Sequence, residues 1–352
     1  MIPEPRLSHG LDLVPTTDET ATKRDFTSDQ EVRWCPGCGD YAILAAVQQF
    51  MPTLGVPREN IVFISGIGCA ARLPYYMNTY GVHSIHGRAP ALATGLAVTR
   101  PDLSVWVVGG DGDLLSIGTN HLLHALRRNI NVKILLVNNR IYGLTKGQYS
   151  PTSEVGKRTK STPVGSVDRP LNPVSLALGA EATFVARTID SDRKHLQGVL
   201  RAAAEHRGAA FVEVLQNCDI YNDGAFDVLK DPVGREAAVV RLEHGEPIRF
   251  GQDGQNGVRI GPRGELEVVE AASADPARLL VHDASADGPE LAFLLSRLGN
   301  VDGGVTPIGV LRSVARPAYD DEARGQVQQV REQRGAGDLA ALLCAGDTWR
   351  VG

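Results

Sequence analysis

The chain has 352 residues, 43% of them hydrophobic and 22% charged, which is enough for a sizeable core in one large domain or two modest ones. Its formal net charge of -5 argues against a nucleic-acid-binding role. No apolar run approaches the roughly 20 residues that span a bilayer, and the acidic first thirty residues do not resemble a secretory signal. We therefore expect a cytoplasmic protein that binds neither nucleic acid nor membrane.

In chain order, residues 1–30 are rich in proline, threonine and charge and predict an irregular arm that is ordered against a partner. Residues 31–235 then alternate short apolar runs with segments of helical period. The predicted strands are 61–65, 104–108, 132–137, 183–187 and 211–215, and the predicted helices are 40–51, 89–99, 118–128 and 191–206. This alternation predicts an α/β domain with a mostly parallel sheet that is covered by helices on both faces.

The segment from 148 to 173 is polar and rich in turn residues, and we interpret it as a long loop over the active face, with a solvated surface loop as the alternative. Residues 236–352 differ in character and predict a C-terminal α+β extension. Short strands are expected within 236–270, a further strand at 279–281, a helix at 289–298 and mostly helix at 318–344.

Unusual residues follow the predicted strands, at the edge where parallel α/β sheets bind ligands. Asp111 lies in a Gly-Asp-Gly-Asp run after one strand, and Asn139 follows the next strand along the chain. Glycines allow a phosphate to approach the backbone, and a carboxylate beside a phosphate indicates a bridging Mg²⁺. The backbone carbonyl of Ile141 would be a third protein ligand. The alternative is an ordinary strand–helix–strand unit with two polar turns.

Four of the five cysteines have related positions. Cys35 and Cys38 form a C-x-x-C at the start of the helix predicted at 40–51, whereas Cys69 and Cys218 each follow a predicted strand. Four thiolates suit either Zn²⁺ or a [4Fe–4S] cluster, and a cofactor whose chemistry releases electrons favours the cluster. Cys344, in an apolar stretch, is predicted to be a small buried residue.

Five motifs in order over residues 30–230 resemble the β subunit of 2-oxoacid:ferredoxin oxidoreductases, and the long C-terminal segment is more similar to the 2-oxoglutarate branch. The motifs are Cys-Pro-Gly-Cys-Gly-Asp, Gly-Ile-Gly-Cys-Ala-Ala-Arg, His-Gly-Arg-Ala, Gly-Asp-Gly-Asp, and Asn-Asn-Arg-Ile-Tyr-Gly-Leu-Thr-Lys-Gly-Gln-Tyr-Ser-Pro-Thr.

The resemblance implies three groups of site residues. One [4Fe–4S] cluster would be bound by Cys35, Cys38, Cys69 and Cys218, and Mg²⁺ by Asp111, Asn139 and the Ile141 carbonyl. The thiamine diphosphate site would be lined by Ile67, Gly68, Cys69, Ala70, His86, Gly112, Asp113, Gly143 and Leu144. Arg72 would pair with a carboxylate of the 2-oxoacid; its alternative is a surface ion pair. His86 would contact the diphosphate; its alternative is a hydrogen-bonded loop histidine.

The resemblance also implies the reaction and the partners. It implies oxidative decarboxylation of a 2-oxoacid, expected to be 2-oxoglutarate, to its coenzyme A thioester, here succinyl-CoA, with release of CO₂ and reduction of ferredoxin. The reverse reaction, which fixes CO₂, is the alternative direction. An α subunit, or a fused γ-α subunit, would complete an (αβ)₂ heterotetramer and supply the carboxylate that activates thiamine, because no glutamate here lies in a suitable motif. The alternatives are a pyruvate-specific member, a non-redox thiamine diphosphate decarboxylase or synthase subunit, and a non-enzymatic zinc- or cluster-binding scaffold.

Overall fold

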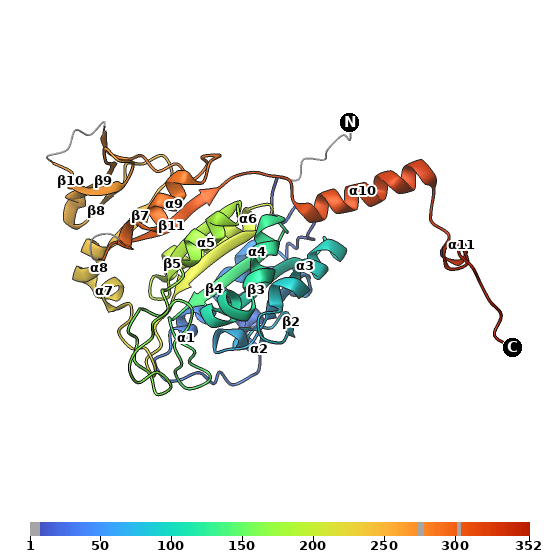
Figure 1. Cartoon of the computed structure of the whole chain (residues 1–352), viewed down its shortest axis with the longest axis horizontal. Coiled ribbons are helices and arrows are strands. Elements are labelled where there is room, and N and C mark those ends of the chain that lie inside the picture. The colour runs from blue at the N-terminus through green and yellow to red at the C-terminus, as the bar shows by residue number, and fades with distance from the viewer. Residues whose placement is uncertain (1–7, 273–277, 301–303) are drawn as a thin grey trace.

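The computed structural model describes residues 8–272, 278–300 and 304–352 and contains an eight-stranded sheet (Figure 1). Its strands lie in the order β2-β1-β3-β4-β6-β5-β11-β7. Their bounds are β1 Ile61–Ser65, β2 Tyr80–His83, β3 Ser104–Gly110, β4 Lys133–Asn138, β5 Phe184–Ile189, β6 Ala210–Leu215, β7 Val239–Leu242 and β11 Thr306–Ser313. The first six strands in this order are parallel, as predicted, and only β11 runs antiparallel to its neighbour β5.

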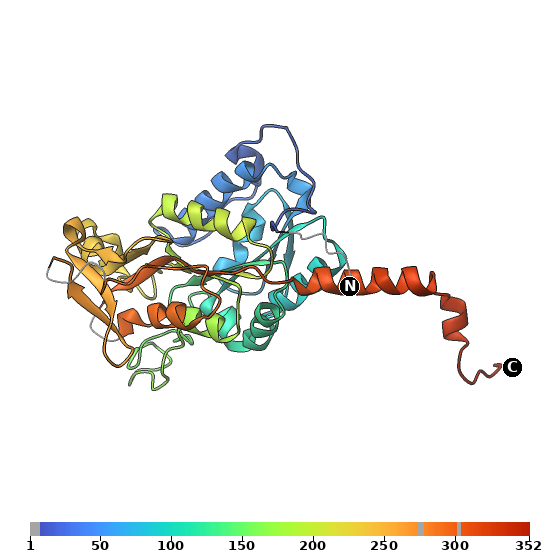
Figure 2. The same ribbon diagram turned by 90° about the horizontal axis from the view of Figure 1, so that it is seen from above.

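Helices cover both faces of the sheet, which confirms the predicted α/β fold (Figure 2). One face carries α1 (Asp40–Phe50) and α6 (Arg193–Glu205), and the other carries α3 (Ala89–Thr99), α4 (Thr119–Arg127), α5 (Pro173–Gly179) and α9 (Glu290–Ser296). In α6 the buried residues Leu196, Val199, Leu200 and Ala203 recur at helical spacing, so one stripe of the helix faces the sheet. Asp192 caps this helix by accepting the backbone N–H of His195.

Residues beyond 235 contribute to the main sheet and to a smaller one. Strands β7 and β11 extend the main sheet, whereas β8 (Arg249–Phe250), β9 (Asn256–Ile260) and β10 (Leu266–Glu270) form an antiparallel sheet. The strand predicted at 279–281 is wrong: Val281 makes only an isolated bridge to Pro247. The division of the chain at residue 235 stays a prediction, since two strands from beyond it pair with the body.

The remaining helices are short, except for one that projects from the body. The short helices are α2 (Leu73–Tyr76), α7 (Asp227–Lys230), α8 (Pro232–Ala238) and α11 (Leu339–Leu343). The longer helix α10 (Tyr319–Arg334) leaves the body and leads to α11, which stands apart from it (Figures 1 and 2). In the described part of the chain, no helix is both long and apolar enough to cross a membrane.

Candidate active site

The buried carboxylate of Asp111 lies just beyond the end of β3, at the carboxyl edge of the sheet. Asp111 is 2% exposed, and its Oδ2 accepts hydrogen bonds from the hydroxyls of Ser150 and Thr152, each at 2.5 Å. Burial raises the pKa of the Asp111 carboxyl to about 6, although these two hydrogen bonds lower it. No ion pair to Asp111 is found in the described part of the chain. A buried carboxylate without a cationic partner fits a bound cation such as Mg²⁺.

A buried polar network positions the groups around Asp111. Arg187 on β5 donates to Glu213 on β6 at 2.6 Å, and Glu213 accepts from the side-chain amide of Asn138 at 2.7 Å. The side-chain oxygen of Asn138, Oδ1, accepts a hydrogen bond from the Thr152 hydroxyl at 2.9 Å. Because both partners of the Arg187–Glu213 pair are almost fully buried, removing either would leave an uncompensated charge inside the sheet.

The next turn contains the other two predicted Mg²⁺ ligands. The side-chain oxygen of Asn139 accepts a hydrogen bond from the backbone N–H of Ile141 at 3.1 Å. The backbone carbonyl of Asn139 accepts one from the side-chain amide of Asn222 at 2.9 Å. Arg140 between them has a φ of 56°, a left-handed conformation that turns the chain sharply. Within the described residues, no three His, Cys, Asp or Glu side chains converge on a single metal ion. The ligand set of Asp111, Asn139 and Ile141 stays a prediction.

Asp113 holds two loops of the site together. Its Oδ1 accepts from the backbone N–H of Gly87 at 2.7 Å and of Ile67 at 3.2 Å, and it lies 2.6 Å from His86 Nδ1. Its Oδ2 is buried without a partner, close to Gly66. Burial raises the pKa of the Asp113 carboxyl, whereas the hydrogen bonds and His86 lower it. Asp113 therefore organises the loops that carry Ile67 and His86.

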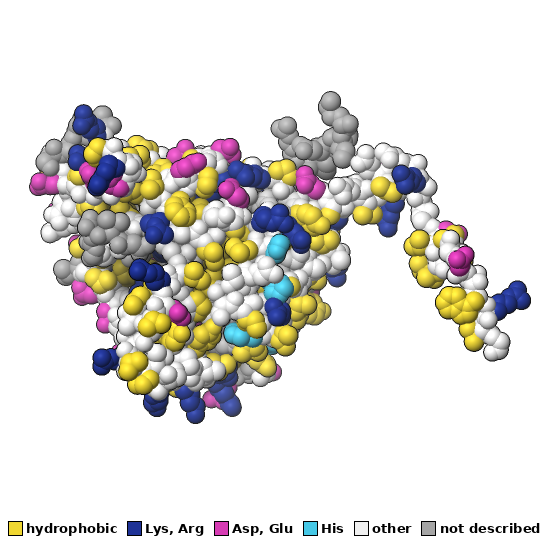
Figure 3. Space-filling view, in the orientation of Figure 1, with side chains coloured by type: hydrophobic (Ala, Val, Ile, Leu, Met, Phe, Trp, Pro, Cys, Tyr) yellow, Lys and Arg dark blue, Asp and Glu magenta, His cyan; other side chains and the backbone are white. Residues whose placement is uncertain are grey.

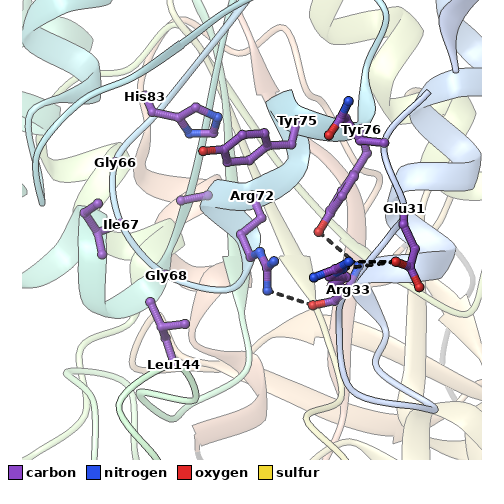
Figure 4. A pocket seen from close by; sticks show the side chains of 12 residues that line it. Glu31, Arg33, Gly66, Ile67, Gly68, Arg72, Tyr75, Tyr76, His83 and Leu144 are labelled. Carbon is purple, nitrogen blue, oxygen red and sulfur yellow. Dashed lines mark hydrogen bonds and ion pairs between the residues drawn. The ribbon is translucent and has the colours of Figure 1, made fainter. Parts of the chain in front are cut away.

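An open pocket of about 650 Å³ lies beside these loops (Figure 4). The side chains of Ile67 and Leu144 point into it and are 46% and 50% exposed, so their apolar surface is available to an organic ligand. Gly68 and Arg72 line the same pocket, and Arg72 donates to the backbone carbonyl of Arg33 at 2.7 Å. The structure thus brings four of the predicted site residues to one cavity.

The other residues that line the pocket were not predicted from the sequence. Among them, Arg33 pairs with Glu31 at 2.9 Å, and Tyr75 stacks on His83 with ring centroids 4.3 Å apart. His83 Nδ1 lies 2.9 Å from the hydroxyl of buried Ser65. These lining residues come from the segment 31–33, from α2 and from the end of β2, so no single motif contains them. Of the described lining residues, Arg33 and Arg72 are basic and Glu31 is acidic, so the pocket has a net positive charge that fits an acidic ligand.

Two of the four predicted cluster ligands lie against the turn that carries Gly143. A Cβ placed on Gly143 would lie 3.5 Å from Cys69 Sγ and 3.7 Å from Cys218 Sγ. The loop with Cys35 and Cys38 is fixed to Cys69 through Trp34, whose indole N–H donates to the Cys69 carbonyl at 2.8 Å. The two distances from the Gly143 Cβ are ordinary van der Waals contacts, so this turn lies directly against the two thiols.

The thiols also influence one another electrostatically. Burial raises the pKa of Cys69 to about 12, and the charges of Asp40, Cys218 and Cys35 raise it further. Burial also raises the pKa of Cys38 and Cys218, with smaller contributions from neighbouring thiols. Binding of iron or zinc would stabilise these thiols as thiolates. The ligand set of Cys35, Cys38, Cys69 and Cys218 stays a prediction, because the described residues contain no group of three such side chains that could hold a metal ion.

The lining of the pocket does not include Ala70, Gly112 or Cys344. Ala70 is 6% exposed and starts a short 3₁₀ turn behind the pocket. The prediction for Cys344 is wrong: it is exposed, because α11 does not pack against the body. Gly112 lies against Tyr142, whose hydroxyl donates to the Gly112 carbonyl at 3.0 Å.

Comparison with known proteins identifies the family of the chain. Residues 66–214 match the family described as "Thiamine pyrophosphate enzyme, C-terminal TPP binding domain". The chain is 63% identical, over 96% of its length and 91% of the relative, to the 2-oxoglutarate oxidoreductase subunit KorB of Mycobacterium tuberculosis. It is 48% identical to the 2-oxoacid:ferredoxin oxidoreductase subunit beta of Sulfolobus sp, over 54% of this chain and 63% of that one.

A solved structure agrees with the sequence relatives. The 2-oxoglutarate:ferredoxin oxidoreductase from Magnetococcus marinus, solved with 2-oxoglutarate, coenzyme A and succinyl-CoA bound, matches with a TM-score of 0.75 and 31% identity, over 95% of this chain and 100% of that one. The thiamine-binding domain, the parallel sheet and the near full-length identity agree, and the chain belongs to the β subunits of the 2-oxoacid:ferredoxin oxidoreductase family.

Proposed function

We propose that the chain is the β subunit of a 2-oxoglutarate:ferredoxin oxidoreductase. The reaction consumes 2-oxoglutarate, coenzyme A and two oxidised ferredoxins, and yields succinyl-CoA, CO₂, one proton and two reduced ferredoxins. The carbon–carbon bond to the carboxylate breaks, the thioester bond forms, and the two electrons released go to ferredoxin. The support for the substrate is the identity to KorB and the two arginines at the pocket.

The proposal of a redox reaction rests chiefly on the position of the pocket beside the thiols. Leu144 lines the pocket, and its neighbour Gly143 lies against the thiols of Cys69 and Cys218. Bound thiamine diphosphate supplies the electron sink for decarboxylation, and a [4Fe–4S] cluster supplies a one-electron acceptor. The turn that carries Gly143 and Leu144 would thus separate a group oxidised in the pocket from the cluster.

The chain's own residues would bind and orient these groups. Asp111, Asn139 and the Ile141 carbonyl would bind Mg²⁺ and through it the diphosphate, with Ser150 and Thr152 holding the carboxylate of Asp111 in place. Asp113 would keep the loops of Ile67 and His86 at the cofactor. Arg72 would bind a carboxylate of the substrate.

We further propose that the enzyme needs a partner α subunit. The carboxylate that lines the pocket, Glu31, is bonded to Arg33 at 2.9 Å and 76% exposed in its side chain. The carboxylate that activates thiamine would then come from the partner. Reduction of a viologen dye by the isolated chain, dependent on 2-oxoacid and coenzyme A, would contradict this part of the proposal.

Cofactor analysis of the complex with its partner, purified anaerobically, tests the proposal. We expect about four irons, about four sulfides and one thiamine diphosphate per β chain, as a Cys₄-bound cluster requires. Cys218→Ser should lose most of the iron but keep thiamine diphosphate, whereas Cys344→Ser, at an exposed position, should keep both. Zinc without sulfide would leave a non-redox thiamine enzyme. Faster turnover of pyruvate than of 2-oxoglutarate would indicate a pyruvate-specific member.

A further inference from the structure

A second hollow, which we name the basic groove, is lined by Lys146 and Gly147, which follow closely in the chain on Leu144 of the first pocket. It has a volume of about 440 Å³, and its lining includes Lys146, Arg158, Lys160, Ile220 and Tyr221. Most of its lining residues belong to the loop between β4 and α5. This loop lies at the lower edge of the molecule, where dark blue Lys and Arg side chains gather (Figure 3).

The three cations of the groove are exposed and have no counter-charge. Lys146, Arg158 and Lys160 make no ion pair within the described residues, and none of the described residues that line the groove is acidic. Glu154, an acid of the same loop, is paired with Lys157 at 3.1 Å. Uncompensated cations around a hollow attract an acidic partner from a distance and favour its rapid association.

The groove adjoins the thiol of Cys218. The backbone N–H of Asn222 donates to the Cys218 carbonyl at 2.9 Å and closes the turn that carries Ile220 and Tyr221. A Cβ on Gly143 would lie 3.7 Å from Cys218 Sγ and 3.9 Å from the Tyr221 ring, so the thiol and the ring lie against the same residue. Tyr221 and Ile220 also line the groove. On the facing wall, a Cβ on Gly147 would lie 2.8 Å from the Tyr221 ring, so the turn packs closely against this loop.

The lining of the groove combines cations with apolar side chains. Ile220, which lines it, is 54% exposed, and Val164, the neighbour of the lining residue Pro163, is 90% exposed. Transient protein interfaces combine apolar and charged surface in this way, and electron-transfer complexes have interfaces at the small end of the range.

We infer that the basic groove is the docking surface for an acidic one-electron carrier protein, and that electrons leave the enzyme at the Cys218 side of the cluster. The inference rests on the proposed function, since it requires a cluster at the four cysteines and a ferredoxin as acceptor. Each docked carrier takes one electron from the reduced cluster, so two carriers dock in succession for each 2-oxoacid oxidised. Among the described residues, the groove and the pocket have no lining residue in common, so a carrier in the groove would not occupy the pocket.

Charge reversal in the holoenzyme tests the inference. We expect Arg158→Glu/Lys160→Glu, made in the complex with the α subunit, to raise the KM for a recombinant acidic bacterial ferredoxin by about tenfold or more at low ionic strength. The Kd for the same ferredoxin, measured by biolayer interferometry without substrate, should rise in parallel. Both differences should shrink as salt is added, because salt screens the attraction. Lys146 is left unchanged, since it lies in the turn of Leu144.

Two controls separate the possible results. Reduction of methyl viologen should be unchanged in the variant, because a small dye needs no docking surface. The matched double variant Arg193→Glu/Lys194→Glu, on exposed residues of α6, should leave the KM and the Kd for ferredoxin within about twofold of the wild type.

Two outcomes would overturn the inference, and a third bears on the proposed function alone. Ferredoxin KM and Kd that stay within about twofold in the groove variant would remove the docking role. A raised KM for coenzyme A with methyl viologen as acceptor would instead make the groove a phosphate-binding site of that substrate. Absence of 2-oxoacid-dependent dye reduction in the wild-type complex would contradict the proposed function, whereas ferredoxin binding would still report on the groove.

Discussion

At the scale of single residues, Gly112 shows how closely the chain packs around the predicted diphosphate site. A Cβ at this position would lie 2.1 Å from the ring of Tyr142, and that ring is held by the bond from its hydroxyl to the Gly112 carbonyl. A side chain at residue 112 would therefore displace Tyr142 and the turn that follows Asn139.

We predict that Gly112→Ala lowers the free energy of unfolding by about 1–3 kcal/mol, the usual cost of overpacking, and weakens thiamine diphosphate binding. Gly110→Ala is the matched control, because the nearest atom to its Cβ would be the Val137 carbonyl oxygen at 3.9 Å, an ordinary contact. Urea unfolding and cofactor titration of both variants measure the effects. Equal stability of the two variants would show that Tyr142 moves aside without cost.

The site residues that the sequence predicts are those that follow strands. Asp111 and Asn139 could be assigned because the carboxyl ends of parallel strands meet at one edge. Ser150 and Thr152 were missed because they lie in an irregular loop, where no period indicates direction. Glu213 did have a signal, since a single carboxylate inside an apolar strand requires a buried partner.

At the scale of elements, α10 is held to the body only through its first turns. Asp321 accepts from Arg207 Nε at 2.8 Å, and the neighbouring Asp320 accepts the backbone N–H of Asn131 at 3.0 Å. Arg324 donates to the carbonyl of Ala97, at the end of α3, at 3.0 Å. Beyond these contacts the helix and α11 are exposed.

We expect Asp321→Ala to lower the free energy of unfolding by about 2 kcal/mol, because it leaves the guanidinium of Arg207, only 6% exposed in its side chain, without its carboxylate. Asp338→Ala is the control: this residue caps α11 by accepting from Ala341, on a helix that does not pack against the body. Thermal unfolding of both variants measures the difference. A similar loss from Asp338→Ala would mean that α11 contributes to the stability of the body.

The sequence predicts the central elements better than the peripheral ones. Strands β1, β3, β4, β5 and β6 are buried along nearly their whole length and therefore have continuous apolar runs. Strand β2 was missed because all four of its residues are exposed. Strand β11 was missed because Pro307 and Gly309 interrupt its apolar pattern, which is tolerated where a strand bulges.

At the scale of the whole molecule, the dependence of stability on pH follows from a histidine at the edge of the sheet opposite to the site. Burial lowers the pKa of His206 from its usual 6.5 to about 3, and the charge of Lys133 lowers it further. Between these values the unfolded chain binds a proton that the folded chain does not. The contribution is therefore fully present above pH 6.5 and is lost as the pH falls toward 3.

We predict that His206→Gln reduces the loss of stability between about pH 7 and about pH 5, because glutamine does not titrate in this range and its amide can still donate to Thr183. The midpoint of urea unfolding at the two pH values, compared with wild type, measures the change. His124→Gln, on an exposed position of α4, should behave as the wild type does. An unchanged pH dependence in His206→Gln would assign the acid sensitivity to other groups.

The place of β11 in the sheet has a consequence for how the protein is made. This strand, close to the end of the chain, lies between β5 and β7 and is the neighbour through which β7 joins the sheet. During synthesis the residues of β5 leave the ribosome long before those of β11. Until then β5 presents unpaired N–H and C=O groups at an open edge, where another chain can pair with it. A nascent chain that stalls before residue 306 would therefore have all of its site-bearing strands and still be prone to aggregate.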